Sequence, residues 1–130
     1  QDMILWVIKA FKDEKNPDIL ARYQEKYQYI LVDEFQDTNW SQNEIVSLLT
    51  DYWDEPNIFV VWDDDQSIFR FQGANLRNIM DFYVKHKNSV QNIVLEKNYR
   101  SSQKILDVAK SSIEFNLERV ATEIWLEKNF

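Results

Sequence analysis

Residues 29–34 read YILVDE, a short apolar stretch that ends abruptly in two adjacent carboxylates. An apolar run of this length, partly β-branched and closed by charged residues, is typical of a buried β-strand. Residues 58–61 read IFVV and form a second run of the same kind, followed by three acidic residues at 63–65. Each predicted strand therefore carries carboxylates at its C-terminal end.

The segment between these two runs predicts a helix. Over residues 41–53 the apolar side chains of Ile45, Leu48, Leu49 and Tyr52 recur at helical spacing. Strand, helix, strand is the parallel βαβ unit, whose crossover brings both strand ends to the same edge of the sheet. Open α/β sheets bind ligands at that edge. We therefore predict an α/β fold with a parallel sheet, flanking helices and a ligand site beside the two acidic clusters.

Further elements are predicted on both sides of this unit from the same periodicities. They are helices over residues 2–11, 17–26 and 76–85, a strand over residues 90–95, and a helix whose N-cap is Ser101 or Ser102. Residues 118–130 show no clear pattern.

The composition is that of one globular unit. Of the 130 residues, 45% are hydrophobic and 28% are charged, which is the balance of a folded domain rather than of a disordered tail. No apolar run approaches the roughly 18 residues of a membrane span. The first two residues, Gln1 and Asp2, lack the basic start of a signal peptide. We therefore expect a cytoplasmic protein with no membrane partner.

Three further counts limit the chemistry. The net charge of −7 argues against a dedicated nucleic-acid-binding domain, because it repels phosphate backbones over the surface as a whole. The absence of cysteine excludes disulfides and thiolate metal sites. The single glycine, Gly73, excludes a Walker A loop within these residues, because that loop needs two glycines to cradle phosphates.

Adjacent carboxylates at a strand end suit magnesium-dependent phosphate transfer. One carboxylate, Asp33, can anchor a hydrated Mg²⁺ while its neighbour, Glu34, orients or deprotonates a water molecule. Successive side chains of a strand point to opposite faces, so the chain must turn here for both to face one ligand. On spacing alone, the alternative that the pair only solvates a strand end remains open.

Three strings in the sequence share a resemblance to one family. Residues 32–39 read VDEFQDTN, residues 63–74 read DDDQSIFRFQGA, and residues 95–102 read LEKNYRSS. They resemble motifs II, III and IV of the UvrD/Rep family of superfamily I DNA helicases, in the family's order and with similar spacing. The resemblance implies a RecA-like P-loop NTPase fold and an internal fragment of a longer motor protein.

The resemblance also implies roles for single residues in ATP hydrolysis. Asp33 would bind Mg²⁺, and Glu34 would be the catalytic base or would orient the attacking water. Gln66 would sense the γ-phosphate of ATP. Arg100 would stabilise the charge that develops on the transferred phosphoryl group, for which a planar guanidinium is well suited. Tyr99 would stack on the adenine base.

Two aromatic residues are candidates for DNA contact. Phe71 occupies the position where the family places an aromatic side chain against a base of single-stranded DNA, a contact worth about 1–3 kcal/mol per base. Phe69 would assist it. Ordinary packing of both rings in the core is the alternative.

The division of the chain follows the motifs. Residues 1–28 would form a helical segment leading from the family's inserted subdomain, residues 29–96 part of the first motor lobe, and residues 97–130 motif IV with the start of the second lobe. The parent protein would couple Mg-ATP hydrolysis to translocation on single-stranded DNA and to unwinding at duplex junctions, in DNA repair or replication. The fragment alone would be inactive, because it lacks motifs I, V and VI.

Two other functions remain open. One is a catalytically inactive, helicase-like module for protein interaction or single-strand binding. The other is a Mg²⁺-dependent nuclease, which the lack of a third, separate carboxylate or histidine cluster disfavours. Trp62 supports the inactive module, because the family has glycine before the first aspartate of motif III. We hypothesise that this indole weakens nucleotide binding or hydrolysis.

Overall fold

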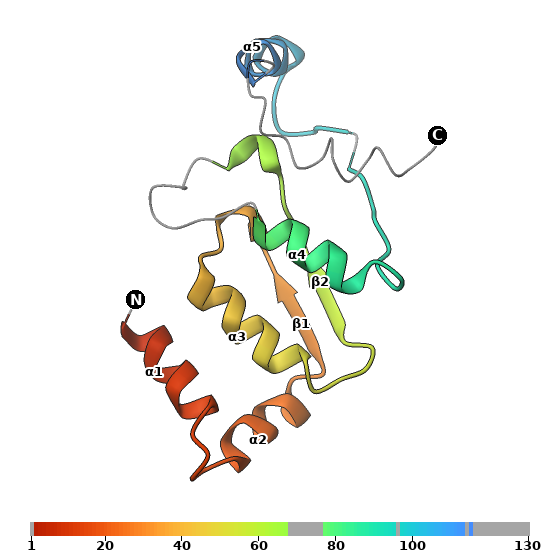
Figure 1. Ribbon diagram of the computed structural model, residues 1–130. Coiled ribbons are helices and arrows are strands. Elements are labelled where there is room, and N and C mark those ends of the chain that lie inside the picture. Colours follow the sequence, from red (N-terminus) through yellow and green to blue (C-terminus); the bar gives the residue numbers. More distant parts are fainter. Residues whose placement is uncertain (1, 68–76, 96, 114, 116–130) are drawn as a thin grey trace.

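The computed structural model describes residues 2–67, 77–95, 97–113 and 115. In chain order the elements are α1 (Asp2–Phe11), α2 (Asp18–Lys26), β1 (Tyr29–Val32), η1 (Phe35–Asp37), α3 (Trp40–Thr50), β2 (Asn57–Val60), η2 (Asp64–Gln66), α4 (Arg77–His86) and α5 (Gln103–Ile113) (Figure 1). Within the described residues, no helix has the length and apolar character needed to cross a membrane.

The predicted βαβ unit is confirmed. β1 and β2 pair in parallel, with Tyr29 opposite Asn57 and Val32 opposite Val60, and α3 connects them. Both strands therefore end at the same edge of the sheet, as a parallel pair joined by a helix must. The two carboxylate clusters follow at this edge, which lies above the sheet in Figure 1.

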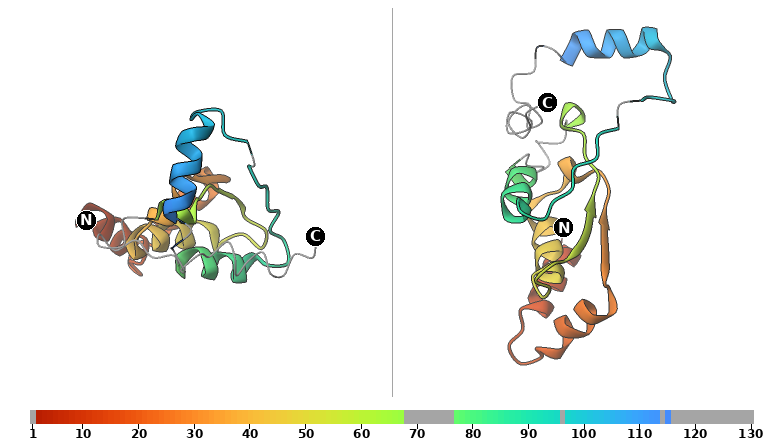
Figure 2. Two further views of the ribbon diagram at one scale, coloured as in Figure 1. Left: turned by 90° about the horizontal axis from the view of Figure 1, so that it is seen from above. Right: turned by 90° about the vertical axis from the view of Figure 1, so that its right-hand side faces the viewer.

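Helices cover one face of the described sheet. Figure 2 shows α3 and α4 on the same side of the two strands. The side chains of both strands alternate between half-buried and exposed, and Leu31 is 74% and Phe59 is 53% exposed. The prediction of buried strands is therefore wrong for one face of the sheet. The physical reason is the period of two along a strand, which turns alternate side chains away from the helices.

The core lies between the sheet and α4. Its centre is Phe35, which is fully buried, and Ile79, which is 2% exposed. Six partly buried side chains pack against this pair: Val32, Val60, Trp62, Met80, Phe82 and Tyr83. The rings of Phe35 and Phe82 meet edge to face with their centroids 5.5 Å apart, a geometry that aromatic pairs favour.

The start of α3 is fixed by a capping box. The Asn39 side chain accepts a hydrogen bond from the Gln42 backbone N–H (3.0 Å), and the Gln42 side chain accepts one from the Asn39 N–H (2.9 Å). These bonds satisfy two donors that the first helical turn leaves unpaired. The helix ends at Thr50, three residues before the predicted end at Trp53, whose N–H bonds to the Thr50 carbonyl in a turn.

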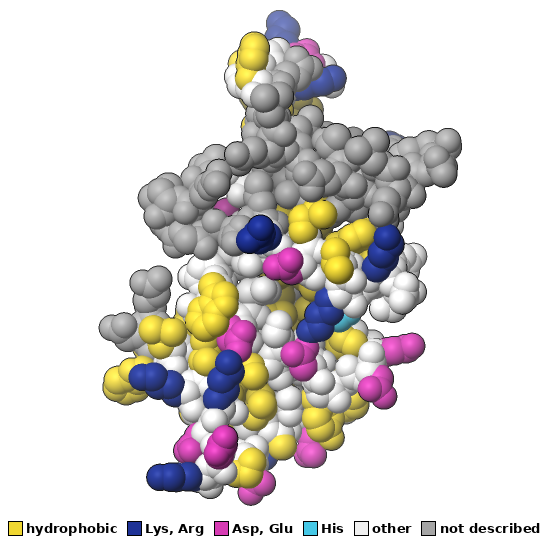
Figure 3. Space-filling view, in the orientation of Figure 1, with side chains coloured by type: hydrophobic (Ala, Val, Ile, Leu, Met, Phe, Trp, Pro, Cys, Tyr) yellow, Lys and Arg dark blue, Asp and Glu magenta, His cyan; other side chains and the backbone are white. Residues whose placement is uncertain are grey.

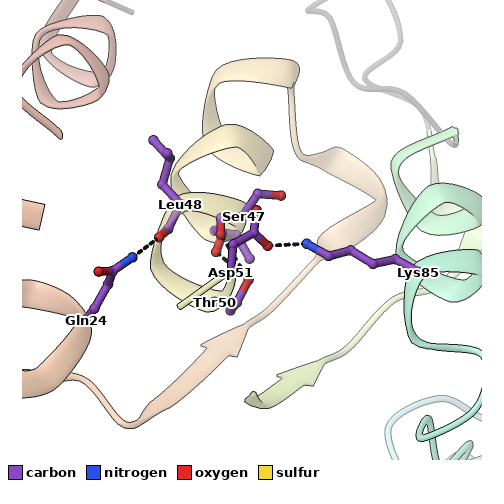
Figure 4. A network of polar contacts seen from close by, with 7 residues as sticks. Gln24, Ser47, Leu48, Thr50, Asp51 and Lys85 are labelled. Atoms are coloured by element: carbon purple, nitrogen blue, oxygen red, sulfur yellow. Dashed lines mark hydrogen bonds and ion pairs between the residues drawn. The ribbon is translucent and has the colours of Figure 1, made fainter. Parts of the chain in front are cut away.

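Two polar contacts hold the C-terminal turn of α3 in place (Figure 4). Gln24 of α2 donates from Nε2 to the Leu48 carbonyl oxygen at 2.7 Å. Lys85 of α4 forms an ion pair with Asp51, which follows α3. The last carbonyls of a helix lack partners within the helix, so Gln24 satisfies one of them and joins α2 to α3.

The N-terminal helices match their predicted ranges. α1 has its predicted bounds, and α2 begins directly after Pro17, whose φ of −61° is already helical. Phe11 and Tyr23 join the two helices through rings with centroids 5.3 Å apart. Lys12, just after α1, forms an ion pair with Glu44 of α3, so the pair of helices packs beside α3.

The prediction of a strand over residues 90–95 is wrong. This segment has no regular structure, and Ile93, Val94 and Leu95 are exposed. An apolar run becomes a strand only where a neighbouring strand offers hydrogen bonds and a face to pack on, and none of the described residues does so here.

The helix predicted after Ser102 is confirmed as α5, which buries none of its residues and stands apart from the sheet in Figure 2. Residues 118–130 lie outside the described part.

Candidate functional site

A β-bulge places the first two carboxylates of the candidate site. The Val61 N–H donates to the Val32 carbonyl (2.9 Å), and the Phe35 N–H donates back to the Val61 carbonyl (2.9 Å). In a regular parallel ladder the returning bond would come from Glu34, so the strand carries one extra residue at this point. Asp33 and Glu34 are thereby lifted out of the pairing, and both are exposed.

The backbone of Glu34 makes the turn that two facing carboxylates require. Its φ of 49° and ψ of 46° lie in the left-handed region, and Glu34 is the one non-glycine residue with positive φ in the described chain. This conformation costs an L-residue about 1–2 kcal/mol. Asp33 Oδ1 accepts the Glu34 N–H at 3.0 Å and stabilises the turn. The chain therefore turns at this position, which is the condition for both carboxylates to face one ligand.

A buried glutamine links the two acidic clusters. Gln36 has no exposed surface, its Nε2 donates to Glu34 Oε2 at 2.6 Å, and its Oε1 accepts the Asp63 N–H at 3.1 Å. The orientation of the amide follows from the Asp63 backbone N–H, which can only donate and so must face the oxygen. The sequence did not single out Gln36 as a site residue, because the burial of Phe35 and Gln36 is visible only in the structure.

The second acidic cluster is a tight turn organised by Asp63. Asp63 Oδ2 accepts from Gln66 Nε2 at 2.6 Å, and Asp63 Oδ1 accepts the Asp65 N–H at 3.0 Å. The Gln66 N–H also donates to the Asp63 carbonyl at 3.1 Å. The structure therefore brings Gln66 and Glu34 into one chain of contacts that runs from Glu34 through Gln36 and Asp63 to Gln66.

Asp37 adds negative charge beside this chain of contacts. Burial raises the pKa of the Asp37 carboxyl, and the nearby Glu34 carboxylate raises it further. Its Oδ1 is buried and accepts no hydrogen bond from the residues that the structure describes. A buried carboxylate oxygen without a donor disfavours the charged form, which agrees with the raised pKa of Asp37.

The remaining residues of the 32–39 string are structural. Thr38 Oγ1 donates to the Phe35 carbonyl at 2.7 Å, and Asn78 of α4 donates from Nδ2 to the Thr38 carbonyl at 2.9 Å. Thr38 and Asn78 are both buried. The string therefore supplies a carboxylate pair, a core residue, a bridging amide and the start of α3 in succession.

No set of acidic side chains encloses a metal by itself. Among the described residues, no three His, Asp or Glu side chains lie close enough together to bind a metal ion. Mg²⁺ bound with a nucleotide needs less, because one or two carboxylates, waters and the phosphate oxygens complete its octahedron. The exposed carboxylate of Asp33 at the strand end could supply one such oxygen ligand.

Two predicted site residues lie in the segment that leads into α5. Tyr99 is 89% exposed, and Arg100 is also exposed. They stand in a turn in which Asn98 Oδ1 accepts the N–H groups of Arg100 and Ser101, both at 2.9 Å. The right-hand view of Figure 2 shows the segment that leads into α5 well separated from η2. Phe69 and Phe71 lie outside the described residues.

Trp62 follows β2 and packs against the core pair of Phe35 and Ile79. Its side chain is half-buried, and it lies on the same side of the sheet as Val60, two residues earlier. The indole is therefore accommodated in the layer between the sheet and α4.

Among the described residues on the face shown in Figure 3, Lys and Arg side chains alternate with Asp and Glu and form no continuous basic track. Such a track is the electrostatic footprint of a protein that binds nucleic acid through its own surface. The described face agrees with the acidic net charge of the sequence.

Comparison with known proteins gives a consistent result. Residues 1–87 match the sequence profile of the UvrD/REP helicase N-terminal domain. The chain is 45% identical over 126 residues to a protein of Leuconostoc citreum named ATP-dependent DNA helicase PcrA. The matched stretch covers 97% of this chain and 16% of that protein. The protein of the same name from Bacillus subtilis is 41% identical over 128 residues, which is 98% of this chain and 17% of that protein. The chain thus spans about one sixth of these relatives.

Proposed function

The chain belongs to the family of the UvrD/REP helicase N-terminal domain, and from this premise we propose that it is part of an ATP-dependent DNA helicase. The parent protein would couple Mg-ATP hydrolysis to translocation on single-stranded DNA and to unwinding at duplex junctions. It would work in the cytoplasm, in DNA repair or replication. The relatives that share 41–45% of its residues carry the name ATP-dependent DNA helicase.

The observation that carries this proposal is the connected set of Glu34, Gln36, Asp63 and Gln66 at the carboxyl edge of β1 and β2. Nucleotides bind to open α/β sheets at that edge. The set joins a carboxylate from the first string to an amide from the second, so a phosphate group placed between them would meet both.

Each side chain has a proposed task. Asp33 would bind Mg²⁺. When bound, this ion would neutralise negative charge on the phosphate oxygens. Glu34 would orient the attacking water and accept its proton, and it can use Oε1 because Oε2 is held by Gln36. Gln66 would report the presence of the γ-phosphate. The Gln66 Nε2 donates a hydrogen bond to Asp63 Oδ2. A phosphate that binds Gln66 would have to displace this carboxylate or accept the second hydrogen of the same nitrogen.

Residues beyond this set complete the proposal. Arg100 would stabilise the phosphoryl transition state and Tyr99 would stack on adenine once the second lobe closes on the first. Phe71, assisted by Phe69, would stack on a base of single-stranded DNA. The exposure of Tyr99 supports this, since an aromatic ring left in water is available to a partner.

We further propose that the chain is an internal piece of a RecA-like P-loop NTPase fold. Residues 1–28 would lead from an inserted helical subdomain, 29–96 would belong to the first motor lobe, and 97–130 would begin the second. The open face of the sheet supports this proposal, because parallel sheets are covered on both faces and Leu31 and Phe59 stand exposed. The chain alone would not hydrolyse ATP.

The test is ATP hydrolysis by the complete polypeptide, with and without single-stranded DNA, beside the Glu34→Gln variant. We expect DNA-stimulated turnover that the variant lowers by about 10²–10⁴-fold, the usual contribution of a general base. A folded parent protein that does not turn over ATP would instead support the inactive, helicase-like binding module. Turnover that survives Glu34→Gln would remove Glu34 from the catalytic role.

A further inference from the structure

The side chain of Gln36 is fully buried between the two acidic clusters. It is a fully buried polar side chain whose two polar atoms are both used, one on Glu34 Oε2 and one on the Asp63 N–H. Buried polar groups are costly unless they are paired, so the amide is held in one orientation by its partners.

We propose that Gln36 is a positioning residue, which aims the Glu34 carboxylate and fixes its distance from the Asp63 turn that holds Gln66. This inference rests on the proposed ATPase function and deepens it. A carboxylate on an exposed β-bulge has freedom to rotate, and the 2.6 Å bond from Gln36 removes that freedom. The bond also leaves one defined oxygen, Oε1, for the reacting water.

The same amide ties two segments that are 27 residues apart in the sequence. Asp63 carries Gln66 through a 2.6 Å bond, so a movement of the η2 turn when phosphate binds or leaves is transmitted to Glu34 through only two side chains. Through Gln36, the orientation of the Glu34 carboxylate therefore depends on the position of Gln66. Small displacements at a reacting centre have large effects on rate, about 10²-fold for about 1 Å.

The chain offers a matched control in Gln24. This glutamine is also buried, at 8% exposure, and it also donates from Nε2, to the Leu48 carbonyl at 2.7 Å (Figure 4). It joins α2 to α3, on elements that contribute none of the site residues. Gln24→Met and Gln36→Met remove the same amide from comparable environments and keep the side-chain volume.

The experiment measures kcat and KM for ATP of the complete parent protein with saturating single-stranded DNA. We expect Gln36→Met to lower kcat by about 10–100-fold and to change KM by less than about threefold, because an interaction that matters mainly in the transition state acts on kcat. Gln24→Met should lower the melting temperature and leave kcat within about twofold of wild type.

A double variant separates positioning from general damage. If Gln36 acts through Glu34, then Gln36→Met added to Glu34→Gln lowers the residual single-turnover rate by less than about twofold, because the group to be aimed is already gone. A further loss as large as in the wild-type background would overturn the proposal, as would a folded Gln36→Met protein with wild-type kcat. If instead Glu34→Gln itself retains wild-type turnover, Glu34 is not the catalytic carboxylate and this inference fails, whereas a folded parent protein that does not hydrolyse ATP would show that the proposed function has failed.

Discussion

Asn78 of α4 donates a hydrogen bond from Nδ2 to the carbonyl oxygen of Thr38, 2.9 Å away, and both residues are buried. This contact joins α4, which follows the second acidic cluster, to Thr38, which lies between η1 and α3. The segments that form the candidate site are therefore held together by a buried amide as well as by the β-bulge and Gln36.

The first prediction concerns this contact. Replacing Asn78 with alanine leaves the buried Thr38 carbonyl without its side-chain donor, and we expect a loss of about 1–3 kcal/mol in the free energy of unfolding. Urea unfolding of the 130-residue chain measures it. The matched control is Asn88→Ala, at an exposed turn position, where the change should stay within about 0.5 kcal/mol. Equal losses in the two variants would show that the Asn78 bond contributes nothing specific.

The second prediction concerns the start of α3. Asn39→Ala removes the oxygen that accepts the Gln42 N–H, and we expect the free energy of unfolding to fall by about 0.5–2 kcal/mol. Asn39→Asp keeps an acceptor at the same place and should recover most of the loss. The measurement is again urea unfolding, and an aspartate variant as unstable as the alanine variant would contradict the capping role.

The third prediction concerns His86, which is half-buried at the end of α4 with its ring centroid 4.7 Å from that of Phe82. Burial lowers the pKa of His86 from its ordinary value of 6.5, the neighbouring Lys85 lowers it further, and Asp51 opposes the shift. Because the folded state binds this proton more weakly, the free energy of unfolding has its full value above pH 6.5 and falls as the pH drops toward the folded pKa.

Stability curves at several pH values check this third prediction. Between pH 8 and pH 5 the wild-type chain should lose stability, and His86→Gln should show a smaller loss because it has no proton to gain. The ion pair of Lys85 and Asp51 is unchanged by this substitution and is common to both proteins. A His86→Gln variant with the wild-type slope would assign the pH dependence to other groups.

The fourth prediction concerns Trp62, which stands where the family has glycine. Trp62→Gly removes an indole that packs on Phe35 and Ile79, and we expect the chain to lose about 2 kcal/mol of stability, less than for a fully buried tryptophan. In the complete parent protein the same change should raise ATP affinity or turnover, if the indole crowds the phosphate site. Unchanged ATPase parameters would show that Trp62 is a packing residue alone.

The local sequence pattern was sufficient to predict those elements whose stabilising interactions come from residues nearby in the chain. α1 has its predicted bounds, and β1 is the apolar run of residues 29–32 because the charged pair that follows ends it. The parallel pairing of β1 and β2 also followed from the order of elements, since the connecting helix permits few alternatives. The identity of Glu34 and Gln66 as candidates came from the strings in which they stand.

The errors have one physical origin. The predicted strand at 90–95 and the predicted burial of the two strands each depended on surfaces that an apolar run cannot supply for itself. Leu31 and Phe59 look as buried in the sequence as Val32 and Val60, yet they face away from α3 and α4.

What the sequence by itself determined is the helices, the two strands β1 and β2 with their parallel order, and the edge of the sheet where carboxylates gather, because these depend on periodicity and on short-range sterics. Only the tertiary structure decided that Glu34 sits on a bulge, that Gln36 is buried between Glu34 and Asp63, and that Asn78 reaches Thr38. Those contacts join residues as many as 40 positions apart, and a hydrogen bond across such a separation forms only when packing has already brought both partners out of water.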